Sequence, residues 1–186
     1  MINNNFKIFI CATEQSGDNI GYNLIKELLK NNNKIQFDGV GGSKMQKVLT
    51  NTFYTLKNFK TIGLFEIFFS LKKYINMINF LVNKILSNNY DLIITIDSPD
   101  FNYPLVKKLR NNKYKIKVLH IVAPSVWAWR AYRAKKFSII YDELFVLFDF
   151  EVKYFTNHNL KTTFIGHPIY YLKCYKNNSL ANNNIA

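Results

Sequence analysis

The chain has 186 residues, with 25 Lys and Arg against 12 Asp and Glu, so its formal net charge is +13. This length suits one domain. A hydrophobic fraction of 48% and a charged fraction of 20% suffice for a buried core and exclude intrinsic disorder for most of the chain. The two cysteines, Cys11 and Cys174, are far apart and lie in no metal-binding spacing, which excludes a disulfide scaffold and a structural zinc site and favours a reducing cytosolic compartment.

The surplus of basic residues has two explanations. Clustered Lys and Arg would suit a polyanion such as nucleic acid. The chain is also crowded with Asn, Ile, Phe and Tyr, which share A/T-rich codons with Lys, so a base-biased genome accounts for the charge without a polyanion site. We favour the compositional explanation and expect no nucleic-acid partner. Attraction to an anionic membrane surface remains compatible with the same charge.

The first residues lack the charged region, long apolar run and cleavage site of a signal peptide, so we expect the chain to stay inside the cell. The most apolar stretch, residues 62–82, is long enough to cross a bilayer. However, Glu66, Lys72 and Lys73 lie in its middle, and each would cost about 2.5–3.5 kcal/mol at the hydrocarbon centre. We therefore predict a helix that does not span a membrane. It either packs in the core, which we favour, or dips an apolar face into the membrane interface.

Short β-branched or aromatic runs alternate with amphipathic stretches along the chain. The predicted strands are residues 6–11, 34–40, 92–96, 116–122, 143–147 and 162–165, and the predicted helices are 19–30, 44–49, 62–82, 103–111, 127–139 and 150–157. Repeated strand–helix–strand order predicts a doubly wound α/β fold, with a parallel sheet and helices on both faces. Such folds bind ligands beyond the carboxyl ends of the strands, so we look for chemistry directly after each strand.

The first strand leads into the segment ATEQSGDNIG at residues 12–21. A small, polar turn that opens a helix presents free N–H groups and a positive helix end, which suit an anion or sugar hydroxyls. A plain N-cap role for Ser16 or Asp18 explains these residues equally well. The segment is not GxGxxG, so the dinucleotide fingerprint is absent.

The third predicted strand, residues 92–96, leads into IDSPDFN at residues 96–102. Asp97 ends the apolar run, and the strand would fix its carboxylate at the ligand-binding edge, so it is a candidate general base. A structural turn is an equally good explanation of Asp97. Asp100 is more simply explained as a cap on the helix that follows.

The segment APSVWAWRAYRAKK follows at residues 123–136. Trp127 and Trp129 alternate with Arg130, and Arg133 lies on the next turn, so aromatic walls would stand beside cations that pair with phosphate. Core tryptophans and a solvated basic face are the simpler explanations. The density of Trp and Arg at a strand end favours a pocket for an anionic, partly apolar ligand.

The three histidines are less informative. His167, in the segment IGHP, is either a ligand contact or a turn residue. His120 lies inside an apolar strand, which indicates a core residue, and His158 is expected at the surface.

Together these segments resemble the lipid-A-disaccharide synthase family, glycosyltransferases of the two-domain GT-B architecture. The matching segments are TEQSGDNIGYNLIKEL (13–28), GVGGSKMQ (39–46), IGLFEI (62–67), IDSPDFN (96–102), VAPSVWAWRAYRAKK (122–136) and FIGHP (164–168). The resemblance covers almost the whole chain, and the PSVWAWR block is its most specific part. It implies that residues 1–175 form a Rossmann-like, acceptor-side N-terminal domain, followed by an Asn-rich tail at 176–186.

The resemblance implies an inverting transfer without metal or cofactor. A 2,3-diacylglucosamine unit would pass from UDP-2,3-diacylglucosamine to the 6-hydroxyl of 2,3-diacylglucosamine 1-phosphate, at the cytoplasmic surface of the inner membrane, with residues 62–82 facing the membrane. Asp97 would be the catalytic base, and Glu14 would position acceptor hydroxyls or assist the base. The residues implied to bind substrate are Ser16, Gly17, Asp18, Trp127, Trp129, Arg130, Arg133 and His167.

The sequence departs from the family pattern in three ways. Thr13 stands where the family usually has Gly, and residues 148–151 read FDFE in place of an LPFE-like run. Nothing after His167 resembles the domain that binds the nucleotide sugar. We therefore expect no transfer activity from this chain alone. If the enzyme is split, a separate donor-domain chain would supply its second half. The alternative is a non-catalytic remnant of the fold that binds membranes or anionic lipids.

Overall fold

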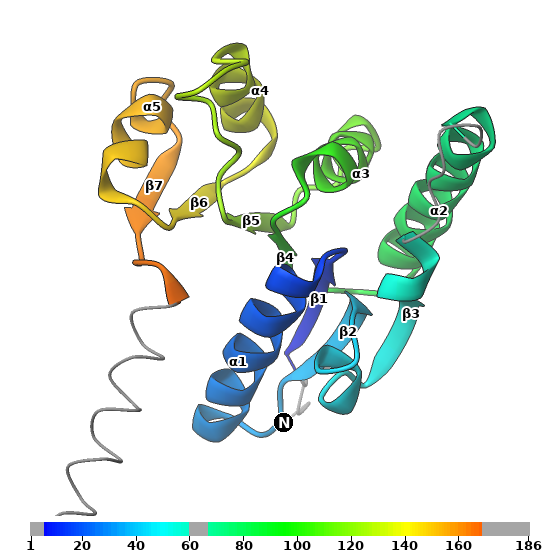
Figure 1. Ribbon diagram of the computed structural model, residues 1–186. Helices are drawn as coiled ribbons and strands as arrows, with labels where there is room; N and C mark the ends of the chain where they lie inside the picture. Colours follow the sequence, from blue (N-terminus) through cyan, green and yellow to red (C-terminus); the bar gives the residue numbers. More distant parts are fainter. Residues whose placement is uncertain (1–5, 60–66, 169–186) are drawn as a thin grey trace, which may run out of the picture.

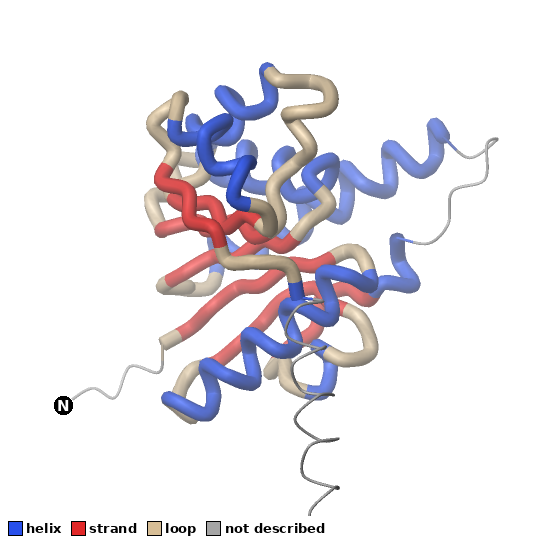
Figure 2. The backbone as a smooth tube through the Cα atoms, turned by 60° about the vertical axis from the view of Figure 1, so that its left-hand side comes forward, coloured by secondary structure: helices blue, strands red, loops and turns tan. Residues whose placement is uncertain are grey.

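The computed structural model describes residues 6–59 and 67–168, which form a parallel sheet flanked by helices (Figures 1 and 2). The strand order is β3-β2-β1-β4-β5-β6-β7, and every pair is parallel. The strands are β1 (Lys7–Ala12), β2 (Gln36–Gly41), β3 (Asn51–Thr55), β4 (Leu92–Ile96), β5 (Lys117–Ile121), β6 (Glu143–Val146) and β7 (Lys161–Phe164). The helices are α1 (Gln15–Asn31), α2 (Ile67–Ser87), α3 (Pro99–Asn111), α4 (Tyr132–Ile140) and α5 (Val152–Thr156), with short 3₁₀ turns at Met45–Lys47, Leu56–Phe59 and Asp149–Glu151.

The sheet has a separate hydrophobic core on each face. Alternate side chains of β1 point to opposite faces, because the side-chain period of a strand is two. Ile8 and Ile10 belong to the core beneath α1, whereas Phe9 and Cys11 belong to the larger core beneath α2, α3, α4 and α5. This arrangement confirms the predicted doubly wound α/β fold.

The structure corrects several predicted boundaries. The edge strand β3 was not predicted, because its first two residues are exposed and it has no alternating apolar pattern. Helix α1 begins at Gln15 and α3 at Pro99, each four residues before the predicted start. Proline suits the first turn of a helix, where its missing N–H would have no partner. Helix α4 begins at Tyr132, five residues after the predicted start. Arg130 has a left-handed backbone, with a φ of 57°, so the helix cannot begin before it.

Helix α2 is buried along only part of its length. Its C-terminal part packs into the core through Met77, Leu81 and Ile85, whereas Leu71 and Ile75 are exposed nearer its start. Among the residues that the structure describes, no helix is both long and apolar enough to cross a bilayer. Residues 62–66 and the tail at 176–186 lie outside the described residues.

His120 is a core residue, as its position in an apolar strand predicted. The side chain is completely buried, with its Nδ1 atom 2.7 Å from the hydroxyl of Thr95. Burial lowers the pKa of His120 to about 3, opposed by a hydrogen bond with the backbone of Val122. The imidazole therefore stays neutral in the folded protein.

We predict that His120 makes the fold less stable in acid. An unfolded chain protonates a histidine below about pH 6.5. Because the folded protein keeps His120 neutral down to about pH 3, the unfolded state binds the extra proton between these limits. The free energy of unfolding should therefore fall with decreasing pH below about 6.5, by up to about 1.4 kcal/mol per pH unit from this group.

Urea unfolding between about pH 7 and pH 4 measures this slope. His120→Gln should reduce it, whatever its effect on stability at neutral pH. His158→Gln, at an exposed position, is the control and should leave the slope unchanged. Equal slopes for the two variants would contradict the prediction.

Candidate functional site

The candidate site lies at the carboxyl ends of β1 and β4. These two strands are neighbours in the sheet although they are far apart in the sequence, because the strand order reverses direction between them. Open α/β sheets bind ligands at this switch point. The loop after β1 carries Glu14 and Ser16, and the turn after β4 carries Asp97 and Ser98.

Asp97 and Ser98 have unusual backbone conformations. Their φ angles are 54° and 46°, in the left-handed region that residues other than glycine rarely adopt. The buried side chain of Asn102 holds the turn, because its Nδ2 atom donates to the carbonyl of Asp97 at 2.7 Å and to that of Ile96 at 3.3 Å. Val122, directly after the adjacent β5, also has a positive φ, of 75°. Strained backbone of this kind costs about 1–3 kcal/mol per residue and clusters at functional sites.

The half-buried carboxylate of Asp97 is oriented by two hydrogen bonds. Its Oδ1 atom accepts from the backbone N–H of Ser98 at 2.8 Å, and its Oδ2 atom accepts from the hydroxyl of Ser16 at 3.1 Å. The hydroxyl of Ser98 donates to Glu14 Oε1 at 2.8 Å. The structure thus brings together Asp97, Glu14 and Ser16, which were candidate site residues in the sequence. Each carboxylate oxygen keeps a further lone pair that can accept from a substrate hydroxyl.

Asp18, also predicted to bind substrate, has another function in this structure. Its side chain is completely buried, and its two oxygens accept from the backbone N–H groups of Gly42 at 2.7 Å, Met45 at 2.9 Å and Lys44 at 3.1 Å. The carboxylate therefore fixes the loop after β2 against α1. Neither Ser16 nor Asp18 is the N-cap of α1, since that position belongs to Glu14.

Gly17, another predicted substrate contact, is buried where α1 crosses the sheet. A Cβ atom at this position would lie 3.1 Å from the Cβ of Ala12 and 3.5 Å from the carbonyl oxygen of Ile96. Its small size thus allows α1 to lie close to β1 and β4, which places Ser16 within reach of Asp97.

The Trp and Arg block divides into separate groups instead of forming one pocket. The exposed Trp127 packs edge-on against Phe150, with ring centroids 5.5 Å apart. The guanidinium of Arg130 stacks on the ring of Trp129 at 3.9 Å, in a cation–π contact on the surface. Arg133 turns away from both and pairs with Asp100 at 2.6 Å. Asp100 thus has an ion-pair partner and no observed side-chain capping bond, since Ser98 is the N-cap of α3.

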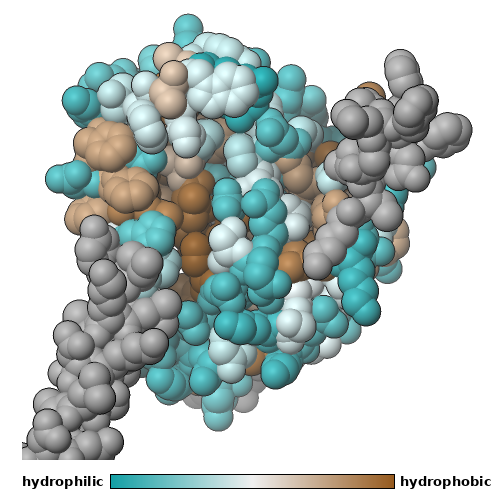
Figure 3. All heavy atoms as spheres, viewed as in Figure 1, coloured by the Kyte–Doolittle hydropathy of each residue, from teal (hydrophilic) through white to brown (hydrophobic). Residues whose placement is uncertain are grey.

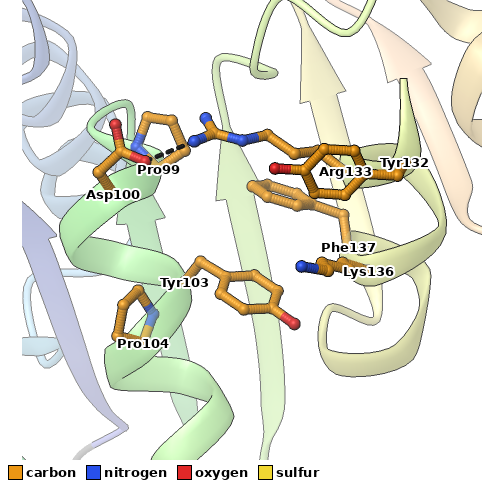
Figure 4. A pocket seen from close by; sticks show the side chains of 8 residues that line it. All are labelled: Pro99, Asp100, Tyr103, Pro104, Tyr132, Arg133, Lys136 and Phe137. Carbon is orange, nitrogen blue, oxygen red and sulfur yellow. Dashed lines mark hydrogen bonds and ion pairs between the residues drawn. The ribbon is translucent and has the colours of Figure 1, made fainter. Parts of the chain in front are cut away.

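A basic pocket surrounds this ion pair at the start of α3 and α4 (Figure 4). Its volume is about 140 Å³. Arg133, Lys136 and the ring of Tyr103 face one another across it, and the side chain of Tyr132 lies over Lys136, 4.6 Å from the ammonium to the ring centroid. The pocket offers two cations and two phenols to an anionic group.

The segment FDFE, whose departure from the family pattern had no explanation in the sequence, has a defined structure. The buried Glu151 accepts from the backbone N–H of Phe148 at 3.2 Å and from the side chain of Trp127. Burial raises the pKa of Glu151, and these bonds oppose the rise. Phe148 and Phe150 stack on each other at 5.7 Å, and the ring of the half-buried His167 stacks on Phe148 at 5.9 Å.

Apolar side chains gather on the face shown in Figure 3 in its middle and along its left margin, near β6 and β7, beside the hydrophilic surface of α1. Phe148, Phe150, Phe164 and Ile165 are among the exposed apolar residues of the chain. His158 is exposed, as predicted. Within the described ranges 6–59 and 67–168, no group of three or more His, Cys, Asp or Glu residues could hold a metal ion.

Comparison with known proteins gives the family of the chain. The sequence profile described as "Lipid-A-disaccharide synthetase" matches residues 8–185. The chain belongs to the lipid-A-disaccharide synthase family. The family member of Rickettsia typhi is 42% identical over 171 residues, which cover 91% of this chain and 45% of that protein. That of Chlamydia muridarum is 39% identical over 161 residues, which cover 87% of this chain and 26% of that protein.

A solved structure supports the fold. The structure of a glycosyltransferase from Rickettsia africae superimposes with a TM-score of 0.52 at 15% identity, covering 95% of this chain and 50% of that chain. At this identity the likeness shows the Rossmann-like α/β fold alone. The chain spans less than half the length of the curated relatives named above.

We predict that Asp18 stabilises the fold. In Asp18→Asn an amide N–H₂ group would replace one of two oxygens that face three backbone N–H donors, so the free energy of unfolding should fall by about 2–4 kcal/mol. Asp149→Asn, at an exposed carboxylate, is the control and should change it by less than about 0.5 kcal/mol. Chemical denaturation measures both. A residue that only bound substrate would leave the stability of Asp18→Asn equal to that of the control.

Proposed function

We propose that this chain supplies the acceptor-binding half and the general base of lipid A disaccharide synthesis. The reaction transfers 2,3-diacylglucosamine from UDP-2,3-diacylglucosamine to the 6-hydroxyl of 2,3-diacylglucosamine 1-phosphate. The observation that carries the proposal is the carboxylate of Asp97, oriented by Ser16 and Ser98 at the switch point of the sheet, with Glu14 beside it. Membership of the lipid-A-disaccharide synthase family supports the choice of substrates.

In the proposed mechanism Asp97 accepts the proton of the acceptor 6-hydroxyl as that oxygen attacks the anomeric carbon of the donor. The new carbon–oxygen bond forms while the bond to the UDP oxygen breaks, so UDP leaves with the bonding electron pair and the configuration inverts. The proton on Asp97 then passes to solvent. Asp97 suits this function because two hydrogen bonds fix its orientation before substrate binds, which favours proton transfer in the transition state.

Neighbouring residues would bind the substrates. The exposed Glu14 holds Ser98 with Oε1 and leaves Oε2 for acceptor hydroxyls. Arg130 and Arg133 would pair with the acceptor phosphate or the donor diphosphate, since guanidinium groups bind phosphate in bidentate geometry. Trp127, Trp129 and His167 would contribute aromatic walls, although the structure places them in separate ring contacts.

A second half must carry the nucleotide-sugar site in this proposal. The chain aligns with 45% of the Rickettsia typhi relative. The exposed rings of Phe148 and Phe150, which follow β6 at the carboxyl edge of the sheet, leave apolar surface that another domain could cover. We propose that a donor domain, in the same polypeptide or in a separate chain, provides that half.

We predict that neither half alone forms disaccharide and that the mixture does. Asp97→Asn should lower the rate of the mixture by about 10²–10⁴-fold, the usual contribution of a general base. Radiolabelled product formation from both substrates in detergent micelles measures these rates. The control is Glu27→Gln, at an exposed carboxylate on α1, which should match the unmodified chain. Turnover by the isolated chain, or full activity of Asp97→Asn in the mixture, would contradict the proposal.

We also propose that the chain works as a peripheral protein on the cytoplasmic face of the inner membrane. Leu71 and Ile75 are exposed near the start of α2, directly beside the exposed Lys72 and Lys73. This combination of apolar and basic residues suits an anionic interface, where each nearby Lys or Arg contributes about 1 kcal/mol. The same feature favours the second candidate function, a non-catalytic remnant that binds anionic lipid.

We predict that the double variant Lys72→Gln/Lys73→Gln weakens binding to anionic phosphatidylserine vesicles by about 10-fold or more. It should not change binding to neutral phosphatidylcholine vesicles, because only the electrostatic attraction is lost. The exposed pair Lys113→Gln/Lys115→Gln is the control of equal charge. Vesicle sedimentation measures both. Equal losses for the two double variants would refute the assignment of this surface, and membrane binding without activity in any mixture would favour the remnant.

A further inference from the structure

An apolar groove opens beside the Asp97 turn. Its volume is about 540 Å³, within the range of about 300–1,000 Å³ that is usual for small-molecule sites. Glu14 and Ser98 mark its polar end, next to the candidate base. The groove runs between α2, the turn Leu56–Phe59 and α3, and its apolar walls are Phe59, Leu71, Tyr74, Ile75, Ile78 and Phe101.

The groove and the basic pocket lie on two sides of the same ridge. Pro99, Asp100 and Pro104, at the start of α3, line both cavities. On one side of this ridge the walls are aliphatic and aromatic, and on the other stand Arg133 and Lys136 (Figure 4). A ligand that occupied both sides would need an apolar chain and an anionic group a short distance apart.

From this juxtaposition we infer that the acceptor lipid straddles the start of α3, with one acyl chain in the groove and its phosphate in the basic pocket. The inference rests on the proposed function and adds which part of the acceptor each cavity takes. Charge determines which cavity takes the phosphate. Glu14 at the polar end of the groove would repel a phosphate, whereas Arg133 and Lys136 in the basic pocket would attract it. The apolar walls favour an acyl chain over a peptide, whose backbone N–H and C=O groups would need partners there.

Asp100 pairs with the arginine that would bind the phosphate. Its carboxylate pairs with Arg133 at 2.6 Å, yet 82% of the Asp100 side chain is exposed against 18% for Arg133. The aspartate can therefore rotate into solvent while the arginine stays in place. A phosphate bound at Arg133 would replace this carboxylate, so Asp100 lowers the affinity of the pocket for anions.

Dodecyl phosphate, which joins one alkyl chain to one phosphate, tests the inference on the isolated chain. We expect it to bind tighter than inorganic phosphate by at least about 100-fold, since each buried methylene adds about 0.8 kcal/mol in full transfer. Titration calorimetry below the micelle concentration measures both affinities. Equal affinities would contradict the assignment of the groove as the binding site of the alkyl chain.

Two matched pairs of variants locate the two ends of the ligand. Leu71→Asn should weaken dodecyl phosphate binding by about 10-fold and leave inorganic phosphate binding unchanged. Its control, Leu86→Asn, is also exposed on α2 but lies away from the groove, and it should change neither affinity.

Arg133→Gln should weaken the binding of both ligands by about 10-fold. Its control, Lys135→Gln, makes an equal charge change outside the pocket and should leave both affinities unchanged. Asp100→Asn should strengthen both. Equal effects within either pair would overturn the corresponding half of the inference.

The outcomes separate this inference from the proposed function. Asp97 lines neither cavity, so Asp97→Asn should bind dodecyl phosphate normally. The same variant should lower transfer in the mixture by about 10²–10⁴-fold. If the mixture is active but Leu71→Asn and Leu86→Asn bind the probe alike, the placement of the chain is wrong and the function stands. If the probe binds as expected and every mixture is inactive, the function fails while the two cavities remain an amphiphile site.

Discussion

The candidate site depends on one strained turn. Asp97 and Ser98 both have left-handed backbone conformations, and only this sharp turn allows the carboxylate of Asp97 and the hydroxyl of Ser98 to face the loop after β1. The buried side chain of Asn102 stabilises this strained conformation, because it donates to two carbonyls of the turn. The N–H of Asp97 also donates to Ile121, on the neighbouring strand, at 2.8 Å. The carboxylate of Asp97, the proposed base, is therefore oriented by the sheet and by α3.

Much of the fold and part of the site could be predicted from the sequence, because both follow from local patterns. Strand period and apolar runs gave the parallel α/β arrangement, and the rule that ligands bind at strand ends selected the loops around Glu14 and Asp97. The edge strand β3 escaped prediction because an exposed strand needs no alternating apolar pattern. The starts of α1 and α3 were missed because Ser, Gly, Pro and Asp at those positions also occur in turns.

Other residues could not be assigned from the sequence, because their partners come from distant parts of the chain. Asp18 has the composition of a loop ligand, but the N–H groups that surround it belong to a loop 24 to 27 residues away. Arg133 lies in the same block as the tryptophans, but the turn at Arg130 directs it toward Asp100 on α3. Phe150 could be placed beside Trp127 only when β5 and β6 were known to be neighbours. In each case the sequence suggested the residue type, and the tertiary contact decided its function.

In the proposed reaction one domain binds the acceptor and a second binds UDP, and the geometry of a single sheet edge explains this separation. An inverting displacement needs the base and the leaving group on opposite sides of the anomeric carbon. The base, the groove and the basic pocket all lie at one edge of one sheet, in segments that pack around the start of α3. One such edge can orient the acceptor hydroxyl, but it presents its charged groups from one side only. In the proposed reaction the leaving UDP would therefore be held by a surface that faces this edge. This geometry explains why the proposal assigns a second domain to transfer and not to binding of the acceptor.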